Sequence, residues 1–363
     1  MIYLDYQATT PLAPEVKAAM LPWLDHFANP HSPNRAGREA AAAVEHARTQ
    51  VASLLPAGGQ LVFTAGATEA LNLALRGIAG RVVTVATEHA AVLDTTEWLQ
   101  RQGRDVEILP VGPDGRVDFD RLRAALRTPT ALVAAMLVNN EIGVVQPVGE
   151  IAALAREAGA LMLCDAVQGF GRLSIPDGPD LIAISAHKIH GPKGIGALWI
   201  RDGVSLEPLI HGGGQERGLR SGTLSPMLCV GFGAAAALAA ERREADHAHV
   251  EQLWLAALDA LGPGWTLNGS SEDRYHGNLN VRCPGLDAAR LLAECRTIAF
   301  SLGSACASGS GRPSHVLRGI GLSDADARQS IRLGFGRYTT FDDLTEACTL
   351  IRRAAEAQQR FAA

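Results

Sequence analysis

The chain has 363 residues, of which 47% are hydrophobic and 20% are charged, and its formal net charge is −5. These values are typical of a globular protein that is long enough for two domains. The lack of a basic excess argues against general nucleic-acid binding, and no run of about 18 apolar residues could span a membrane. Because residues 1–10, MIYLDYQATT, have a strand-like pattern without an apolar signal core, we expect a cytoplasmic protein.

The predicted elements begin with an extended segment over 1–14 and helical patterns over 14–24 and 35–55. Apolar strand patterns then alternate with helical ones, which favours an α/β fold with a mostly parallel sheet covered on both faces. The predicted strands are 61–63, 82–86, 106–110, 131–138, 161–163, 181–184 and 197–200.

The pattern changes after residue 225, where a long alanine-rich helix runs towards residue 261 and a mixed α+β segment follows. We therefore expect two domains. The large domain is predicted to cover 15–245, and a smaller domain to combine 1–14 with 246–363.

Polar side chains recur at the carboxyl ends of the predicted strands. In open α/β sheets that edge is where ligands bind, so polar ends from several strands of one sheet predict a site. The residues concerned are Thr64, His89, Asn140, Asp165, Gln168, His187 and Lys188.

Lys188 is unusual because the chain contains 33 lysines and arginines, of which only Lys17, Lys188 and Lys193 are lysine. Arginine stays protonated, whereas a lysine can lose its proton and form a Schiff base with a carbonyl group. The alternative interpretation is a solvated surface charge. The scarcity of lysine and its position at a strand end favour a chemical role for Lys188, and we interpret Lys193 as a loop charge near the mouth of the site.

The residues after the 61–63 strand form a small-residue turn, Gly66-Ala67-Thr68-Glu69, that opens a helix. Free N–H groups at such a helix start can bind an anion, although a simple helix cap without a ligand is the alternative. Together, Thr68, Ser185 and His187 could hold a phosphate.

Asp165 follows a buried strand, where a carboxylate needs a partner. A pyridinium N–H, as in pyridoxal phosphate (PLP) enzymes, would be one such partner, and a helix cap or ion pair is the alternative. Gln168 could donate to a ring oxygen. His89 could lie against an aromatic ring or move protons, or it could simply be hydrogen-bonded at its strand end.

The six cysteines contain no CxxC pair and no cluster with zinc spacing, which predicts free thiols and no metal site. Cys306 differs from the rest because Gly, Ser and Ala surround it, the setting of an exposed, reactive thiol on a mobile loop. An incidental exposed cysteine is the alternative.

Arg332 alternates with apolar neighbours, which suits either carboxylate recognition or an internal ion pair. The glycine-rich segment 211–223 should be irregular and approach a ligand or a partner subunit.

Taken in order, these motifs resemble those of the NifS/IscS-type cysteine desulfurases, PLP enzymes of the class V aminotransferase group. The resemblance implies PLP fold type I, a homodimer, and conversion of L-cysteine to L-alanine, with sulfur passed through an enzyme persulfide to a protein acceptor in iron–sulfur or other pathways. The motifs are YLDYQATTP, FTAGATEALN, TEHAAVLD, VNNEIGVVQP, CDAVQ, SAHKIHGPKGIGALW, HGGGQERGLRSGT, LGSACASGS and SIRLGFGRYTT.

The resemblance also implies roles for individual residues. Lys188, Cys306 and His89 are catalytic, Thr223 comes from the second subunit to the phosphate, and Asn140 and Arg332 bind the substrate carboxylate. The implied cofactor-binding residues are Ala67, Thr68, His89, Asn140, Asp165, Gln168, Ser185, His187, Lys188 and Thr223.

Three other functions compete with this interpretation. A selenocysteine lyase or a cysteine sulfinate desulfinase could act without the loop thiol, and a non-catalytic scaffold of an iron–sulfur assembly complex could keep the fold alone. A Rossmann dehydrogenase is disfavoured because no GxGxxG follows the first strand. The short C-terminus leaves open whether it docks a scaffold protein.

Overall fold

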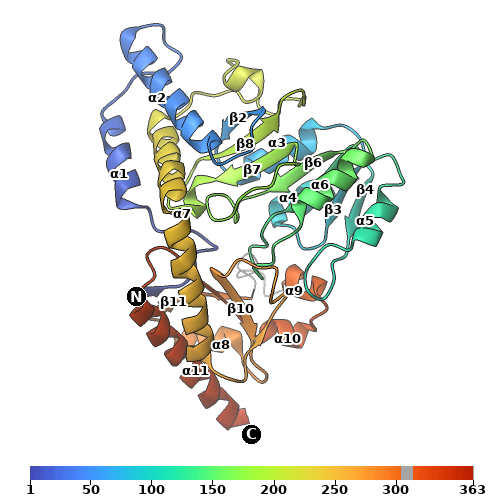
Figure 1. Cartoon of the computed structure of the whole chain (residues 1–363), viewed down its shortest axis with the longest axis vertical. Helices are drawn as coiled ribbons and strands as arrows, with labels where there is room; N and C mark the ends of the chain where they lie inside the picture. Colours follow the sequence, from blue (N-terminus) through green and yellow to red (C-terminus); the bar gives the residue numbers. More distant parts are fainter. Residues whose placement is uncertain (304–313, 363) are drawn as a thin grey trace.

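The computed structural model describes residues 1–303 and 314–362, and its largest sheet has seven strands in the order β2-β8-β7-β6-β5-β3-β4 (Figure 1). All neighbours pair in parallel except β8, which is antiparallel to β2 and β7. The predicted α/β class with a mostly parallel sheet is confirmed. The strands are β2 (Gly59–Thr64), β3 (Val82–Val85), β4 (Val106–Leu109), β5 (Leu132–Met136), β6 (Leu161–Asp165), β7 (Leu181–Ser185) and β8 (Gly196–Arg201).

Alternate residues of the central strands face two different helix layers, because successive side chains of a strand point to opposite faces. In β5, Val133 and Ala135 belong to a core with α2, α5, α6 and α7, whereas Leu132 and Ala134 pack with α3 and α4. Burial on both faces explains why these strands read as continuous apolar runs. The helices are α2 (Arg35–Ala52), α3 (Ala67–Gly77), α4 (Ala90–Arg101), α5 (Phe119–Ala125), α6 (Val148–Glu157) and α7 (Pro226–Leu261).

A second hydrophobic core lies around a four-stranded sheet in the order β12-β13-β10-β9. The start of the chain joins this region, since β1 (Ile2–Tyr3) pairs in parallel with β11 (Ile298–Ala299) and Leu4 is buried in the second core. The other elements are β9 (Thr266–Leu267), β10 (Asn278–Arg282), α8 (Ala288–Glu294), β12 (Ser301–Leu302), α9 (His315–Gly319), α10 (Asp324–Arg328), β13 (Ser330–Gly334) and α11 (Phe341–Ala362).

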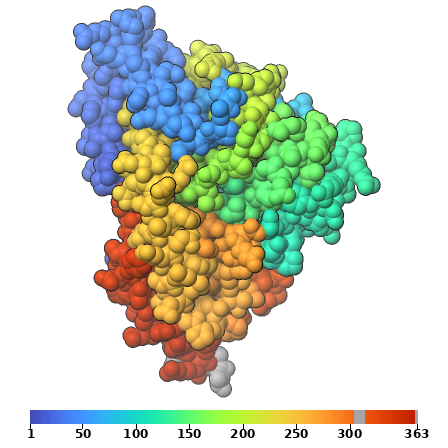
Figure 2. Space-filling model, in the orientation of Figure 1, coloured from blue at the N-terminus to red at the C-terminus, as the bar shows by residue number. Residues whose placement is uncertain are grey.

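Helix α7 is the long element that reaches both cores. Its first half packs on α2 and its second half on α11, and it runs between the upper and lower parts of the molecule in Figures 1 and 2. Phe232 belongs to the core of the large sheet, whereas Leu253 belongs to the second core. The proposed domain boundary after residue 245 falls inside this continuous helix, and the division into 15–245 and 1–14 plus 246–363 stays a prediction.

Two segments differ from the sequence-based expectation. The helix expected over 14–24 is α1 (Pro14–Met20) followed by a 3-10 turn, η1 (Leu21–Leu24), at the position where Pro22 removes a backbone donor. The segment 211–223, expected to lack regular structure, contains the short 3-10 turn η3 (Glu216–Gly218). Within the described ranges, no helix has the length and apolar character needed to cross a membrane.

The contribution of α7 to the second core can be tested by comparing Leu253→Ala with Leu255→Ala. Leu253 is fully buried and Leu255 is 65% exposed on the same helix. Because a cavity replaces the buried side chain, Leu253→Ala should lower the free energy of unfolding by about 2–5 kcal/mol in urea denaturation. Leu255→Ala should change it by less than about 0.5 kcal/mol. Equal effects of the two substitutions would contradict this packing.

Candidate active site

A cavity of about 430 Å³ opens at the carboxyl edge of the large sheet, where β2, β3, β5, β6 and β7 end. It brings together ten residues that the sequence analysis singled out, although they are separated by up to 265 positions. They are Ala67, Thr68, His89, Asn140, Asp165, Gln168, Ser185, His187, Lys188 and Arg332.

One other predicted residue, Thr223, is not among the described residues that line the cavity. Thr223 is exposed and lies in the segment before α7. Cys306 lies outside the described residues. Lys193, interpreted as a loop charge, is exposed and does line the cavity.

Lys188 ends the 3-10 turn η2 (Ala186–Lys188), which directly follows β7. Its Nζ donates hydrogen bonds to the backbone carbonyl oxygens of Gln7 and, at 2.8 Å, of Ala8. The N-terminal segment therefore supplies two hydrogen-bond acceptors to the amine of Lys188, which lies far from it in the sequence. The sequence could not predict this contact, because every residue has a backbone carbonyl oxygen and the residue type does not show which one accepts a hydrogen bond.

The pKa of Lys188 is lowered from its ordinary value of 10.5 to about 7. Burial is the largest cause, since it disfavours the charged ammonium, and the positive charges of Arg172 and Arg332 add to it. Asp5 and Asp165 act in the opposite direction. A substantial fraction of this amine is therefore neutral, and nucleophilic, near neutral pH.

Asp165 ends β6, and its Oδ1 accepts a hydrogen bond from the backbone N–H of Val167 at 3.0 Å. Burial raises the pKa of this carboxyl, although the charges of His89 and Lys188 lower it. Burial also raises the pKa of Glu88 well above its usual value, with the charge of Asp165 as a second cause. A cation placed against Asp165 would stabilise its ionised form in this dry environment.

The start of α3 lines the cavity and has the backbone N–H groups that suit an anion. Ala67 and Thr68 begin the helix, where backbone N–H groups have no partner within the helix. Gly196 of β8 packs closely against this turn: a Cβ at Gly196 would lie 2.7 Å from the carbonyl carbon of Gly66 and 2.8 Å from the nitrogen of Ala67. The shape of this turn therefore depends on a glycine in the neighbouring strand.

His187 lines the same cavity. Its Nδ1 is 3.1 Å from Thr9 Oγ1. Burial lowers the pKa of His187 to about 4, and the charges of Lys188 and Lys193 contribute. The ring is thus neutral at pH 7 and can donate one hydrogen bond without adding a charge.

Of the two alternatives that the sequence left open for Arg332, the structure shows the internal ion pair, and carboxylate recognition stays a prediction. Arg332 forms this ion pair with Nη2 at 2.7 Å from Asp5 Oδ1, and it donates to Ser301 Oγ at 3.1 Å and to the carbonyl oxygen of Asn140 at 3.0 Å. The side chain is only 1% exposed, yet it lines the cavity, and its Nε has no hydrogen-bond partner among the described residues. The guanidinium is held in one orientation and keeps donor capacity for a carboxylate.

Arg172 is a residue that the sequence analysis missed. Its Nη2 donates to the carbonyl oxygen of Lys188 at 2.6 Å and its Nη1 donates to Gln168 Oε1 at 2.9 Å. The guanidinium also lies over the ring of Tyr275, 5.3 Å from its centroid. Arg172 thus fixes the side-chain amide of Gln168, whose Nε2 donates to the Gln7 carbonyl oxygen at 3.0 Å. The guanidinium of Arg172 also places a positive charge near the amine of Lys188.

Comparison with known proteins agrees with this geometry. The aminotransferase class-V family model matches residues 2–346. The chain is 46% identical to "Cysteine desulfurase IscS" of Rickettsia bellii, over 96% of this chain and 90% of that protein. An X-ray structure of a NifS-like protein from Rickettsia africae superposes with a TM-score of 0.91 at 29% identity, covering 98% of this chain and 99% of that one. The structure titled "SspA in complex with cysteine" gives 0.84 at 36% identity, covering 94% and 100%.

The chain belongs to the class-V aminotransferase family and, within it, to the NifS/IscS-type cysteine desulfurases. Enzymes of this family depend on PLP, and the cavity fits that cofactor. The helix start at Ala67 suits its phosphate, the buried carboxylate of Asp165 suits its pyridine nitrogen, and the weakly basic amine of Lys188 suits its aldehyde.

The low pKa of Lys188 can be measured directly in the cofactor-free protein, because labelling lysine with ¹³C at Cε gives only three signals. The Lys188 signal should titrate with a midpoint of about 7. Since the folded pKa lies below 10.5, the folded state binds fewer protons than the unfolded state between these pH values, so stability should rise across this range.

Arg172→Met should raise the midpoint because it removes a nearby positive charge. Arg243→Met provides the matched control, since Arg243 donates to Ser174 and is not among the charges that act on Lys188. A wild-type midpoint near 10.5, or the same shift in both variants, would contradict the electrostatic account.

Gly196→Ala should weaken PLP binding about tenfold, because the new methyl group would press on the turn at the start of α3 and on the carbonyl oxygen of Ile184, 2.6 Å away in β7. The affinity can be measured by titrating the cofactor-free protein with PLP and following its absorbance. Gly149→Ala is the control, since a Cβ there meets only Pro176 at 3.6 Å. Unchanged affinity in Gly196→Ala would show that the turn tolerates the displacement.

Proposed function

We propose that this protein is a cysteine desulfurase that converts L-cysteine to L-alanine and transfers the sulfur to Cys306 as a persulfide. The observation that carries the proposal is one cavity in which an amine with a pKa of about 7, Lys188, lies with the buried carboxylate of Asp165 and the guanidinium of Arg332. The relatives named cysteine desulfurase support it over a selenocysteine lyase, a cysteine sulfinate desulfinase or a scaffold. The similar structure in complex with cysteine supports the choice of substrate.

The proposed roles follow from what each side chain can donate or accept. Lys188 binds PLP covalently and carries protons, Asp165 pairs with the pyridine nitrogen, His89 lies against the ring, and Gln168 contacts the ring oxygen. The phosphate is held by Ala67, Thr68, Ser185 and His187 of one subunit and Thr223 of the other, and the substrate carboxylate by Asn140 and Arg332.

When bound, PLP supplies an electron sink for the carbanion formed at the substrate Cα. Arg332 would hold the substrate carboxylate, and Lys188, once the substrate amine has released it from the cofactor, would take the Cα proton with its neutral amine. The Cys306 thiolate attacks the substrate sulfur and forms the S–S bond while the Cβ–S bond breaks. The electron pair of the broken bond stays with carbon, which takes up protons and leaves as alanine.

We also propose a homodimer and a protein acceptor for the persulfide sulfur. The exposure of Thr223 away from the cavity supports the dimer, because a second copy could bring it to the phosphate. A cytoplasmic location is consistent with the five described cysteines, which are all buried free thiols. Delivery to iron–sulfur cluster assembly is the expected use of the sulfur in this family.

The function can be tested by incubating the PLP-loaded protein with L-cysteine and a reducing thiol, then measuring alanine and sulfide. Cys306→Ser should abolish both products, because serine cannot accept sulfur as a persulfide. The same variant should keep the visible absorbance of bound PLP, whereas Lys188→Ala should lose the absorbance of the lysine-bound form.

The same assay separates the alternatives. Alanine formation by the wild-type protein from selenocysteine or cysteine sulfinate, with none from cysteine, would indicate a lyase or desulfinase. Absence of products from all three substrates in the wild-type protein would leave the scaffold.

A further inference from the structure

The irregular segment between β8 and α7 contains a strained turn. Glu216 and Arg217 have φ angles of 49° and 57°, in the left-handed region that residues with a β-carbon rarely adopt. Two consecutive residues in this region persist only where their surroundings hold them. The contacts of Glu216 therefore indicate what fixes the segment.

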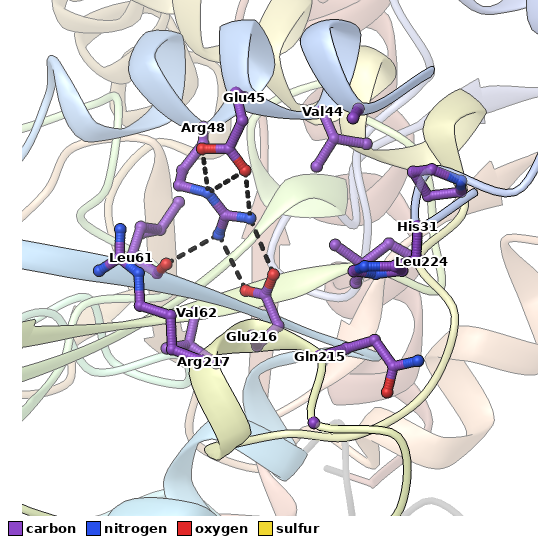
Figure 3. Close-up of a pocket in the computed structure, with 13 residues that line it drawn as sticks. His31, Val44, Glu45, Arg48, Leu61, Val62, Gln215, Glu216, Arg217 and Leu224 are labelled. Atoms are coloured by element: carbon purple, nitrogen blue, oxygen red, sulfur yellow. Dashed lines mark hydrogen bonds and ion pairs between the residues drawn. The ribbon is translucent and has the colours of Figure 1, made fainter. Parts of the chain in front are cut away.

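Glu216 forms a two-point ion pair with Arg48 of α2 (Figure 3). Its Oε1 accepts from Arg48 Nη2 and its Oε2 from Arg48 Nη1, both at 2.8 Å. The side chains are 3% and 14% exposed, so water screens the pair weakly. They line a cavity of about 290 Å³ between α2 and the segment, where Glu45 approaches the same guanidinium.

The same ion pair binds the edge of the large sheet. Strand β2 is at the edge, so its outer N–H and C=O groups lack a neighbouring strand. Arg48 Nη1 donates to the Leu61 carbonyl oxygen at 2.8 Å, and the backbone N–H of Phe63 donates to Glu216 Oε2 at 2.6 Å. The segment is thereby fastened to the strand that leads into the phosphate-binding turn.

A second ion pair fastens the segment four residues further on. Arg220 Nε lies 2.7 Å from Oε1 of Glu69, in the first turn of α3. Oε2 of Glu69 accepts a hydrogen bond from the backbone N–H of Ala65 at 2.7 Å. Both pairs thus use the same arrangement: an arginine, a carboxylate, and a backbone N–H at the entrance to the phosphate-binding turn.

Thr223 follows Arg220 by three residues and is exposed. On its other side, Ser225 caps α7, with Oγ accepting from the backbone N–H of Leu228 at 3.4 Å. The geometry points to the pairs Arg48–Glu216 and Arg220–Glu69 as a positioning device that holds Thr223 outward for the phosphate site of a second copy. This inference rests on the proposed dimer and assigns positioning roles to four residues that are not among those lining the active-site cavity.

The test uses mixed dimers in which only one subunit carries Lys188, so that borohydride can fix PLP at one site alone. In the first dimer, Glu216→Gln and Lys188→Ala are on the same chain and its partner is wild type. In the second, Lys188→Ala alone is paired with a wild-type chain and serves as the reference. PLP is titrated into each cofactor-free dimer, and the fixed cofactor is quantified by fluorescence.

The first dimer should need about tenfold more PLP than the reference, because its intact site receives Thr223 from the altered chain. Arg220→Met in place of Glu216→Gln should weaken binding in the same direction, which guards against misfolding of either variant. Thermal melting of each dimer checks that the folds are equal. Wild-type PLP affinity in both altered dimers would overturn the inference.

Arg217→Met is the matched control, since Arg217 lies in the same turn with the same backbone strain and contacts only Gln60 by hydrogen bonding among the described residues. It should leave PLP affinity unchanged; a loss as large as that of Glu216→Gln would overturn the role of the ion pair.

Sedimentation of the wild-type protein separates the proposed dimer from the proposed positioning role. A monomer would overturn the dimer together with this inference, whereas a dimer with unaltered affinity would overturn this inference alone.

Discussion

The chemistry proposed for this site depends on keeping the amine of Lys188 partly unprotonated inside the protein. Burial achieves this, and Arg172 and Arg332 add repulsion that outweighs the attraction of the nearby carboxylates. The rest of the cavity follows from that constraint, because an amine of ordinary basicity would remain charged and unreactive near neutral pH. The shared end of the strands brings the lysine, Arg332 and the buried Asp165 to one cavity.

The sequence predicted the parts of the site that depend on local order. Asp165 and Lys188 follow apolar runs, and a parallel sheet brings such positions to one edge. It could not predict Arg172, Asp5 or the carbonyl oxygen of Gln7, because their roles arise from contacts between distant segments. The hydrogen bond from Lys188 to Gln7, for example, joins residues 181 positions apart.

The sequence predicted where helices and strands occur more accurately than the residues at which they begin and end. Asp165 belongs to β6 itself, whereas the pattern placed it after the strand. In the segment 211–223, the glycine content indicated irregular backbone but gave no sign that Glu216 and Arg217 would adopt left-handed angles. The partners of Glu216, Arg48 of α2 and the backbone N–H of Phe63 in β2, come from segments far away in sequence and hold that local conformation.

Helix α7 connects the two hydrophobic cores of the molecule. Its 36 residues run without interruption from the core of the large sheet into the second core. Any rotation of one core against the other would have to bend this helix or pull half of it out of its packing. One continuous helix thus packs in both cores, so Lys188, which follows β7 of the large sheet, and Arg332, in β13 of the four-stranded sheet, line one cavity from two cores that share this helix.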